Sequence, residues 1–178
     1  AKLITQLFGD RMYIANATGC SSIWGGSAPS TPYTVNKDGK GPAWANSLFE
    51  DNAEYGYGMF LAQSTIRNRT IAKVLELSKT TKATALKKAC EEYLETVDDG
   101  EKNSPATDNL IAALKKTKNK ATEEILKDAD YLRKKSMWIF GGDGWAYDIG
   151  FSGVDHVIAQ GEDVNIFVFD TEVYSNTG

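Results

Sequence analysis

Residues 137–170, MWIFGGDGWAYDIGFSGVDHVIAQGEDVNIFVFD, contain two short apolar runs on either side of an amphipathic stretch. The first run, 137–140, leads into a glycine-rich turn, and apolar residues at helical spacing follow over 147–160. The second run, 164–169, leads into a polar segment. A strand, a glycine-rich turn, a helix and a second strand predict a right-handed βαβ unit, in which the two strands are parallel.

A third candidate strand, 12–15, also precedes a loop that contains glycine. Polar loops therefore follow all three predicted strands, over 16–26, 141–148 and 170–178. In an open parallel sheet, ligands bind at the carboxyl ends of the strands. If the three strands are neighbours, their loops meet at one edge, and we expect a phosphate or diphosphate group to bind there.

The composition is that of a soluble globular protein. The 178 residues are 42% hydrophobic and 25% charged, which excludes a disordered or collagen-like chain. The net charge of −4 argues against a general nucleic-acid binder. No apolar stretch is long enough for a transmembrane helix. The first residues show no signal peptide and no initiator methionine, so we expect a cytoplasmic protein and a chain that is part of a longer one.

The middle of the chain is charged and helical. Residues 70–135 hold 26 of the 44 charged side chains but only two of the 19 aromatic ones. This contrast predicts a helical insertion over about 65–135, and we assign it no catalytic role. The spacing of its apolar residues predicts helices over 83–96, from a cap at Thr107 or Asp108 to 117, and over 120–134, with a loop over 98–105.

An earlier helix is predicted from Ser47 to Ser78. Ser47 is followed three residues later by Glu50, which is the pattern of a capping box. Gly56 and Gly58 lie inside the predicted helix, and each costs about 1 kcal/mol relative to alanine. Such glycines allow another backbone or a ligand to come close, although a break in the helix is an equal alternative.

Asp143 is the candidate metal ligand. It lies between two glycines at a strand-to-helix turn, where backbone N–H groups and the helix dipole favour phosphate oxygens. A carboxylate among phosphates repels them unless a divalent cation lies between, so we expect Asp143 to bind Mg²⁺ or Ca²⁺. The hydroxyl of Thr171 and the backbone carbonyl of Val173 would add further oxygen ligands.

Other readings of these residues stay open. A Gly-Asp-Gly sequence also forms ordinary turns. The neighbouring carboxylates of Asp148, Asp170 and Glu172 are equally suited to capping helices or pairing with surface charges. His156, on the predicted helix, is expected to pack or to be exposed rather than to act in catalysis.

Four longer segments resemble a known family. ANATGCSSI (15–23), GPAWANSLFEDNAE (41–54), GDGWAYDIG (142–150) and DTEVYSNTG (170–178) resemble the thiamine diphosphate-binding domain of pyruvate:ferredoxin (flavodoxin) oxidoreductases. The resemblance covers essentially the whole chain, 1–178. It implies a three-layer α/β fold with a parallel sheet, namely the half of a thiamine diphosphate-binding fold that holds the diphosphate.

The resemblance also implies residue roles. Asp143, Thr171 and Val173 match the Mg²⁺ ligands, and Cys20 matches a ligand of the [4Fe–4S] cluster nearest the thiamine. Asn176 matches a catalytic polar group beside the reactive carbon and the substrate. The walls of the cofactor site match Asp143, Gly144, Trp145, Ala146, Tyr147, Asp148, Thr171, Glu172, Val173, Tyr174, Ser175 and Asn176.

The activity that the resemblance implies is the coenzyme A-dependent oxidative decarboxylation of pyruvate to acetyl-CoA and CO₂, a reaction of anaerobic metabolism. Electrons pass through iron–sulfur clusters to ferredoxin or flavodoxin, and the parent protein is expected to be a homodimer with further domains. An oxidoreductase for another 2-oxo acid and a non-catalytic α/β binding module remain alternatives.

The two cysteines limit what the chain does alone. From the residues, Cys20 at a strand end is ambiguous, and Cys90 on an apolar helix face is expected to be a buried free thiol. A [4Fe–4S] cluster needs four thiolates. In the family, the other cysteines and the other half of the thiamine site lie elsewhere in a longer chain, so we expect the isolated fragment to be inactive.

Overall fold

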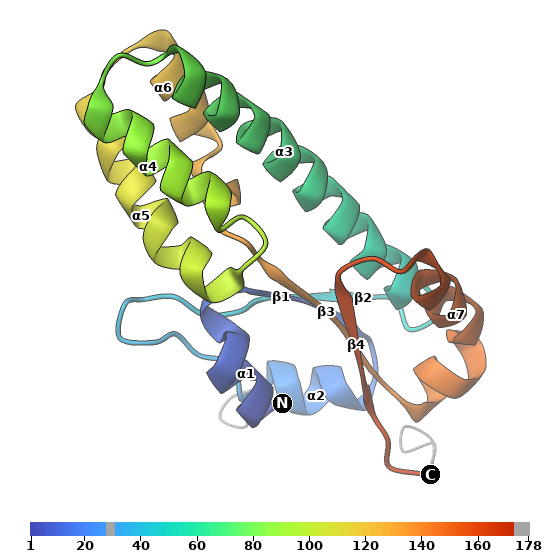
Figure 1. The fold of residues 1–178 in the computed structure, drawn as a ribbon. Coiled ribbons are helices and arrows are strands. Elements are labelled where there is room, and N and C mark those ends of the chain that lie inside the picture. Colours follow the sequence, from blue (N-terminus) through green and yellow to red (C-terminus); the bar gives the residue numbers. More distant parts are fainter. Residues whose placement is uncertain (28–30, 173–178) are drawn as a thin grey trace. The chain divides into compact units, whose positions relative to one another are not determined.

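The computed structural model describes residues 1–27 and 31–172, and they divide into two compact units (Figure 1). One unit comprises residues 1–60 and 135–178 and contains the sheet. The other, residues 61–134, is built from helices. Within the described residues, no helix is both long and apolar enough to cross a membrane.

The sheet has four parallel strands in the order β2-β1-β3-β4. The strands are β1 (Met12–Ala17), β2 (Ala43–Ser47), β3 (Ser136–Gly142) and β4 (Val164–Phe169). The prediction of parallel strands over 12–15, 137–140 and 164–169 is confirmed. The sequence analysis did not predict β2, which pairs with β1 in parallel register from Tyr13↔Ala43 to Ala17↔Ser47.

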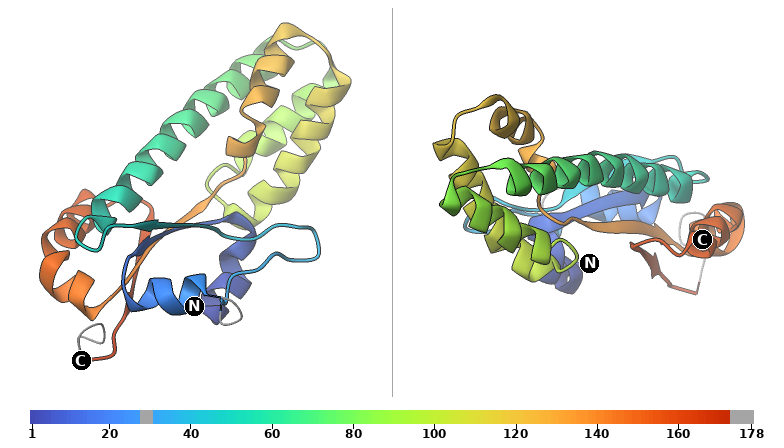
Figure 2. Two further views of the ribbon diagram at one scale, coloured as in Figure 1. Left: turned by 180° about the vertical axis from the view of Figure 1, so that it is seen from behind. Right: turned by 45° about the horizontal axis from the view of Figure 1, so that its top comes forward.

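Alternate side chains of the strands enter two separate cores. Ile14 and Phe140 point to the face that is covered by α1 (Lys2–Phe8) and α2 (Cys20–Gly26), which lie on the same side of the sheet (Figure 2). Ile139 packs on the other face with α7 (Phe151–Gln160) and the start of α3 (Asn52–Thr80). This unit is therefore an α/β sandwich of three layers, and the expected α/β class with a parallel sheet is confirmed.

The start of α3 differs from the prediction. The helix begins at Asn52, and Ser47 is instead the last residue of β2. The Ser47 hydroxyl donates a hydrogen bond to the Asp51 carboxylate over 2.6 Å. The predicted capping box at Ser47 and Glu50 is wrong, because pairing with β1 holds this segment in an extended conformation.

Gly56 lets α3 lie directly on the sheet. A Cβ atom at this position would lie 2.6 Å from Cγ1 of Ile139 and 3.0 Å from Cβ of Ala15. A Cβ atom on Gly58 would meet nothing within 4 Å. The helix continues through both glycines, so close approach to the strands, and not a break, accounts for Gly56.

The helical unit contains the rest of α3 with α4 (Thr84–Glu95), α5 (Gly100–Lys116), α6 (Lys120–Lys127) and a 3₁₀ turn (Ala129–Tyr131). The predicted loop over 98–105 is correct for Asp98 and Asp99 but wrong from Gly100 onward, where α5 begins. Asp99 caps it by accepting hydrogen bonds from the N–H groups of Glu101 and Lys102. Thr107 is buried inside this helix, so the predicted cap at Thr107 or Asp108 is also wrong.

The backbone carbonyl of Leu132 accepts two side-chain hydrogen bonds in the helical unit. It accepts hydrogen bonds from the Tyr93 hydroxyl at 2.8 Å and from Nε of Arg67 at 3.4 Å. Burial raises the pKa of Tyr93 to about 12, although Arg67 opposes the shift. Cys90 is a buried free thiol in the same core, as predicted, and burial raises its pKa to about 11.

The two glycines of α3 allow a matched stability test. Gly56→Ala should destabilise the chain, because overpacking costs about 1–3 kcal/mol and outweighs a gain in helix propensity of at most about 1 kcal/mol. Gly58→Ala should raise the free energy of unfolding by about 0.5–1 kcal/mol, since the position is open. Urea unfolding of both variants measures the difference; equal effects at the two sites would contradict the packing described for α3.

Candidate functional site

The segments that follow β1, β3 and β4 leave the sheet at one edge, as predicted. The predicted loop over 16–26 is wrong, because β1 continues to Ala17 and α2 begins at Cys20. Of the predicted loop over 170–178, only residues 170–172 lie in the part of the chain that the structure describes. Strands β1, β3 and β4 are adjacent and parallel, so the segments that follow Ala17, Gly142 and Phe169 leave the sheet at the same edge. The register pairs Gly142 directly with Phe169. The residues immediately beyond this pair therefore lie close together although they are far apart in the sequence.

Asp143 and Thr171 are in direct contact at this edge. The N–H of Thr171 donates to both carboxylate oxygens of Asp143, at 3.0 and 3.1 Å, and its hydroxyl donates to Oδ2 at 2.6 Å. The hydrogen bond from the hydroxyl and, next, that from the N–H hold the pKa of Asp143 below the ordinary value for aspartate, although desolvation opposes this shift. The carboxylate is thus ionised and tied to the next strand end.

Asp170 organises the turn that follows β4. Its carboxylate accepts a hydrogen bond from the N–H of Glu172 at 3.1 Å and another from the hydroxyl of Tyr147 at 2.9 Å. Glu172 has a φ of 59°, in the left-handed region. The bond to Asp170 raises the pKa of Tyr147, and the negative charges of Asp170 and Asp143 add to the shift. Tyr147 thereby connects the loop after β3 to the loop after β4.

The segment that follows Asp143 continues as a π-helical turn, Trp145–Ile149, before α7. The indole of Trp145 is fully buried, and a Cβ atom on Gly141 would lie 2.2 Å from it. Ala146 is also buried, whereas Asp148 is exposed. Trp145 and Ala146, predicted to line the cofactor site, place their side chains in the core. These two residues can therefore contact a ligand only through their backbone groups.

Cys20 follows β1 at the same edge, as the first residue of α2, and is half-buried. The loop before it is held by Ser22, whose hydroxyl accepts from the N–H of Gly19 at 2.9 Å and donates to its carbonyl at 2.6 Å. Val173, Tyr174, Ser175 and Asn176, which were also predicted as site residues, lie outside the residues that the structure describes.

An asparagine network joins β1 and β2 at this edge. Nδ2 of Asn16 donates to the Ala17 carbonyl and to Oδ1 of Asn46, both at 2.9 Å. Asn46 in turn donates to the hydroxyl of Thr18, which bonds the carbonyl of Ser47. The sequence analysis placed Asn16 and Thr18 in the polar segment 16–26 but assigned no role to Asn16, Thr18 or Asn46. Because asparagine is uncommon in strands, its occurrence at two strand ends was the available signal.

The oxygen donors present suit a hard cation. Among the described residues, no group of three or more His, Cys, Asp or Glu side chains is placed to hold a metal. The donor pair here is instead a carboxylate and a hydroxyl, 2.6 Å apart. Adjacent ligands of an octahedral Mg²⁺ with bonds of about 2.1 Å lie about 3 Å apart. The 2.6 Å separation of the Asp143 and Thr171 oxygens is close to this spacing.

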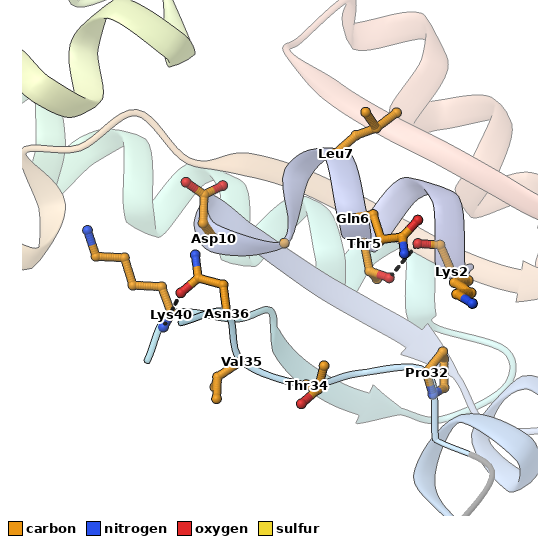
Figure 3. A pocket seen from close by; sticks show the side chains of 11 residues that line it. Lys2, Thr5, Gln6, Leu7, Asp10, Pro32, Thr34, Val35, Asn36 and Lys40 are labelled. Carbon is orange, nitrogen blue, oxygen red and sulfur yellow. Dashed lines mark hydrogen bonds between the residues drawn. The ribbon is translucent and has the colours of Figure 1, made fainter. Parts of the chain in front are cut away.

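A separate cavity of about 530 Å³ lies beside α1 (Figure 3). Lys2 and Lys40 stand at its opposite ends, and Asn36 accepts hydrogen bonds from the backbone of Asp38 and Lys40. None of the residues that line it belongs to the segments that follow β1, β3 and β4.

Three relatives match the chain over nearly its whole length. A pyruvate:ferredoxin oxidoreductase of Moorella thermoacetica is 54% identical over 99% of this chain and 16% of its own length. A pyruvate-flavodoxin oxidoreductase of Klebsiella pneumoniae is 56% identical over 100% of this chain and 15% of its own. A mitochondrial pyruvate dehydrogenase (NADP⁺) of Euglena gracilis is 49% identical over 99% of this chain and 10% of its own.

The chain is therefore homologous to pyruvate:ferredoxin and pyruvate-flavodoxin oxidoreductases. It spans about a sixth of their length. No protein-family model matches it.

Thr171→Val should raise the pKa of Asp143 toward the ordinary value for aspartate, because the variant lacks the hydroxyl donor. In the unaltered chain, the stability from ionised Asp143 is present above the ordinary carboxyl pKa. It is lost as the pH falls through the lowered pKa of the folded state. A ¹³C NMR titration of the carboxyl group measures the shift. Asp99 is the internal control. Hydrogen bonds from Lys102, first of all from its backbone N–H, lower the pKa of Asp99, and this pKa should be the same in the variant.

Proposed function

We propose that this chain holds the magnesium diphosphate of thiamine diphosphate and is the part of a pyruvate:ferredoxin (flavodoxin) oxidoreductase that binds this cofactor. One observation carries the proposal: Asp143 and Thr171 adjoin at the carboxyl ends of neighbouring parallel strands. This edge is where open α/β sheets bind phosphate ligands. The identity of about half of all residues with such oxidoreductases supports the choice of enzyme.

In this proposal, the Asp143 carboxylate and the Thr171 hydroxyl hold Mg²⁺, with the Val173 carbonyl as a third ligand. The metal offsets the repulsion between the carboxylate and the diphosphate oxygens. Backbone N–H groups of the segments 143–148 and 171–176 would surround the diphosphate, and Asn176 would lie beside the substrate. When bound, thiamine diphosphate supplies the electron sink for decarboxylation. The chain's own residues bind the cofactor and fix its orientation.

The chain spans 10–16% of the length of the three relatives described above. We propose that this protein oxidatively decarboxylates pyruvate with coenzyme A in the cytoplasm and acts as a homodimer. Ferredoxin or flavodoxin is the proposed electron acceptor. The name of the Euglena gracilis relative specifies NADP⁺, which favours a second candidate acceptor. Segments outside residues 1–178 would bind coenzyme A and the remaining electron carriers.

Cys20 is proposed as one ligand of a [4Fe–4S] cluster. Such a cluster requires four thiolates, and the chain has two cysteines. The second, Cys90, lies in the core of the helical unit with a raised pKa, which disfavours the thiolate that a metal needs. The other ligands would come from the remainder of the longer protein.

Calorimetric titration with thiamine diphosphate and Mg²⁺ tests the proposed site. Asp143→Asn should weaken binding by more than about tenfold, a loss seen even for residues in the outer shell of metal sites. Excess EDTA should abolish binding to the unaltered chain. Asp155→Asn, an exposed change on α7, is the matched control and should bind normally. Binding that survives both Asp143→Asn and EDTA would refute the magnesium diphosphate site.

The purified 178-residue chain should retain no stoichiometric iron–sulfur cluster, because it supplies at most one available thiolate. Iron and acid-labile sulfide analysis after anaerobic reconstitution measures this. Four iron atoms per chain would contradict the assignment of Cys20 as a single ligand of a shared cluster.

A further inference from the structure

The sheet divides into two pairs of strands at its carboxyl edge. The pairing of β1 with β3 ends at Asn16↔Phe140. Beyond this point β1 stays with β2, through Ala17↔Ser47 and a hydrogen bond from the N–H of Thr18 to the Ser47 carbonyl at 3.1 Å. Strand β3 stays with β4 as far as Gly142↔Phe169. The loops at 18–20 and 143–148 leave from the two sides of this division.

Asn52, the first residue of α3, bridges the division. Its Nδ2 group donates one hydrogen bond to the carbonyl of Ala15 in β1 at 3.2 Å and another to that of Phe140 in β3 at 3.0 Å. Both bonds are buried, and the side chain has no exposed surface. Ala15 and Phe140 belong to the last residues over which β1 and β3 are paired, so one amide group joins the two strands where their pairing ends.

The orientation of this amide is fixed by its acceptors. Rotating it by 180° would place Oδ1 against two carbonyl oxygens, so Nδ2 must face the strands. Oδ1 consequently points away from them and has no hydrogen-bond partner among the described residues. Within the described residues, both hydrogen bonds of this side chain are therefore made to the strands.

The backbone of α3 places Asn52 over the division. Gly56 lies one turn later on the same face of the helix. A Cβ atom there would overlap Ile139 of β3 and come within 3.0 Å of Ala15 of β1. The helix therefore packs on the same two strands that Asn52 joins. A shift of α3 along the sheet would disrupt both the packing at Gly56 and the hydrogen bonds of Asn52.

We propose that Asn52 is a positioning residue. By tying the ends of β1 and β3 together where the sheet divides, it sets the spacing between Cys20 at the start of α2 and the loop that carries Asp143. Its effect on cofactor affinity rests on the function proposed above, whereas its effect on the strand ends does not. Asn52 acts through the backbone of these strands and needs no contact with a ligand.

Hydrogen exchange measured by mass spectrometry tests the positioning role at a temperature where each variant is fully folded. Asn52→Ala should speed exchange by about tenfold in the segments 15–20 and 140–148, since the local opening free energy sets the exchange rate. Asn103→Ala is the matched control. Asn103 is equally buried and its Oδ1 accepts from the N–H of Lys134 at 2.7 Å, inside the helical unit. Its change should leave both segments unaltered.

The same variants are titrated with thiamine diphosphate and Mg²⁺. Asn52→Ala should bind at least about tenfold more weakly, and Asn103→Ala should bind normally. Normal affinity in Asn52→Ala, or exchange that rises evenly across the sheet, would overturn the positioning role. If the unaltered chain fails to bind while Asn52→Ala still speeds exchange at the two segments, the proposed function fails and the bridge stands.

Asn52→Ser serves if Asn52→Ala does not fold. Its hydroxyl bonds one carbonyl at most, so exchange should rise less than in Asn52→Ala but in the same two segments. Exchange equal to that of the unaltered chain would contradict the proposal.

Discussion

The parallel register of β3 and β4 is the constraint on which the candidate site depends. It pairs Gly142 with Phe169, so the residues just beyond this pair come into hydrogen-bond contact although 28 positions separate Asp143 from Thr171. A change of one residue in this register would turn the side chains of one strand to the opposite face. The buried rows led by Ile139 on one face and Phe140 on the other resist such a change.

Packing beneath the loops supports the same geometry. The buried indole of Trp145 lies against Gly141 and Gly150, where a Cβ atom would come within 2.5 Å of Trp145 at either position. The turn after β3 is thus anchored in the core while Asp143 remains at the surface. At the other strand end, Asp170 holds Tyr147 and the N–H of Glu172. The buried part of the turn after β3 therefore positions Asp143, whose carboxylate lies outside the core.

Sequence patterns predicted those elements whose signal is local. The apolar runs over 12–15, 137–140 and 164–169 form β1, β3 and β4, of which β1 and β3 are largely buried and β4 is partly buried. Asp143 and Thr171 come shortly after the last two of these runs. Strand β2 was missed because AWANS is short, partly exposed and contains Asn46. The start of α5 was missed because Gly100, Ser104 and Pro105 are typical of loops, whereas the Asp99 cap and tertiary packing favour a helix. Asn52 was not predicted as a bridge, because its acceptors lie 37 and 88 residues away.

Anomalous diffraction from crystals of the chain grown with Mn²⁺ and thiamine diphosphate tests the central claim most directly. The account predicts one strong manganese peak in contact with both the Asp143 carboxylate and the Thr171 hydroxyl, with diphosphate oxygens completing its ligands. A well-ordered cofactor whose metal lies at another edge of the sheet, or whose diphosphate binds without Asp143, would contradict it.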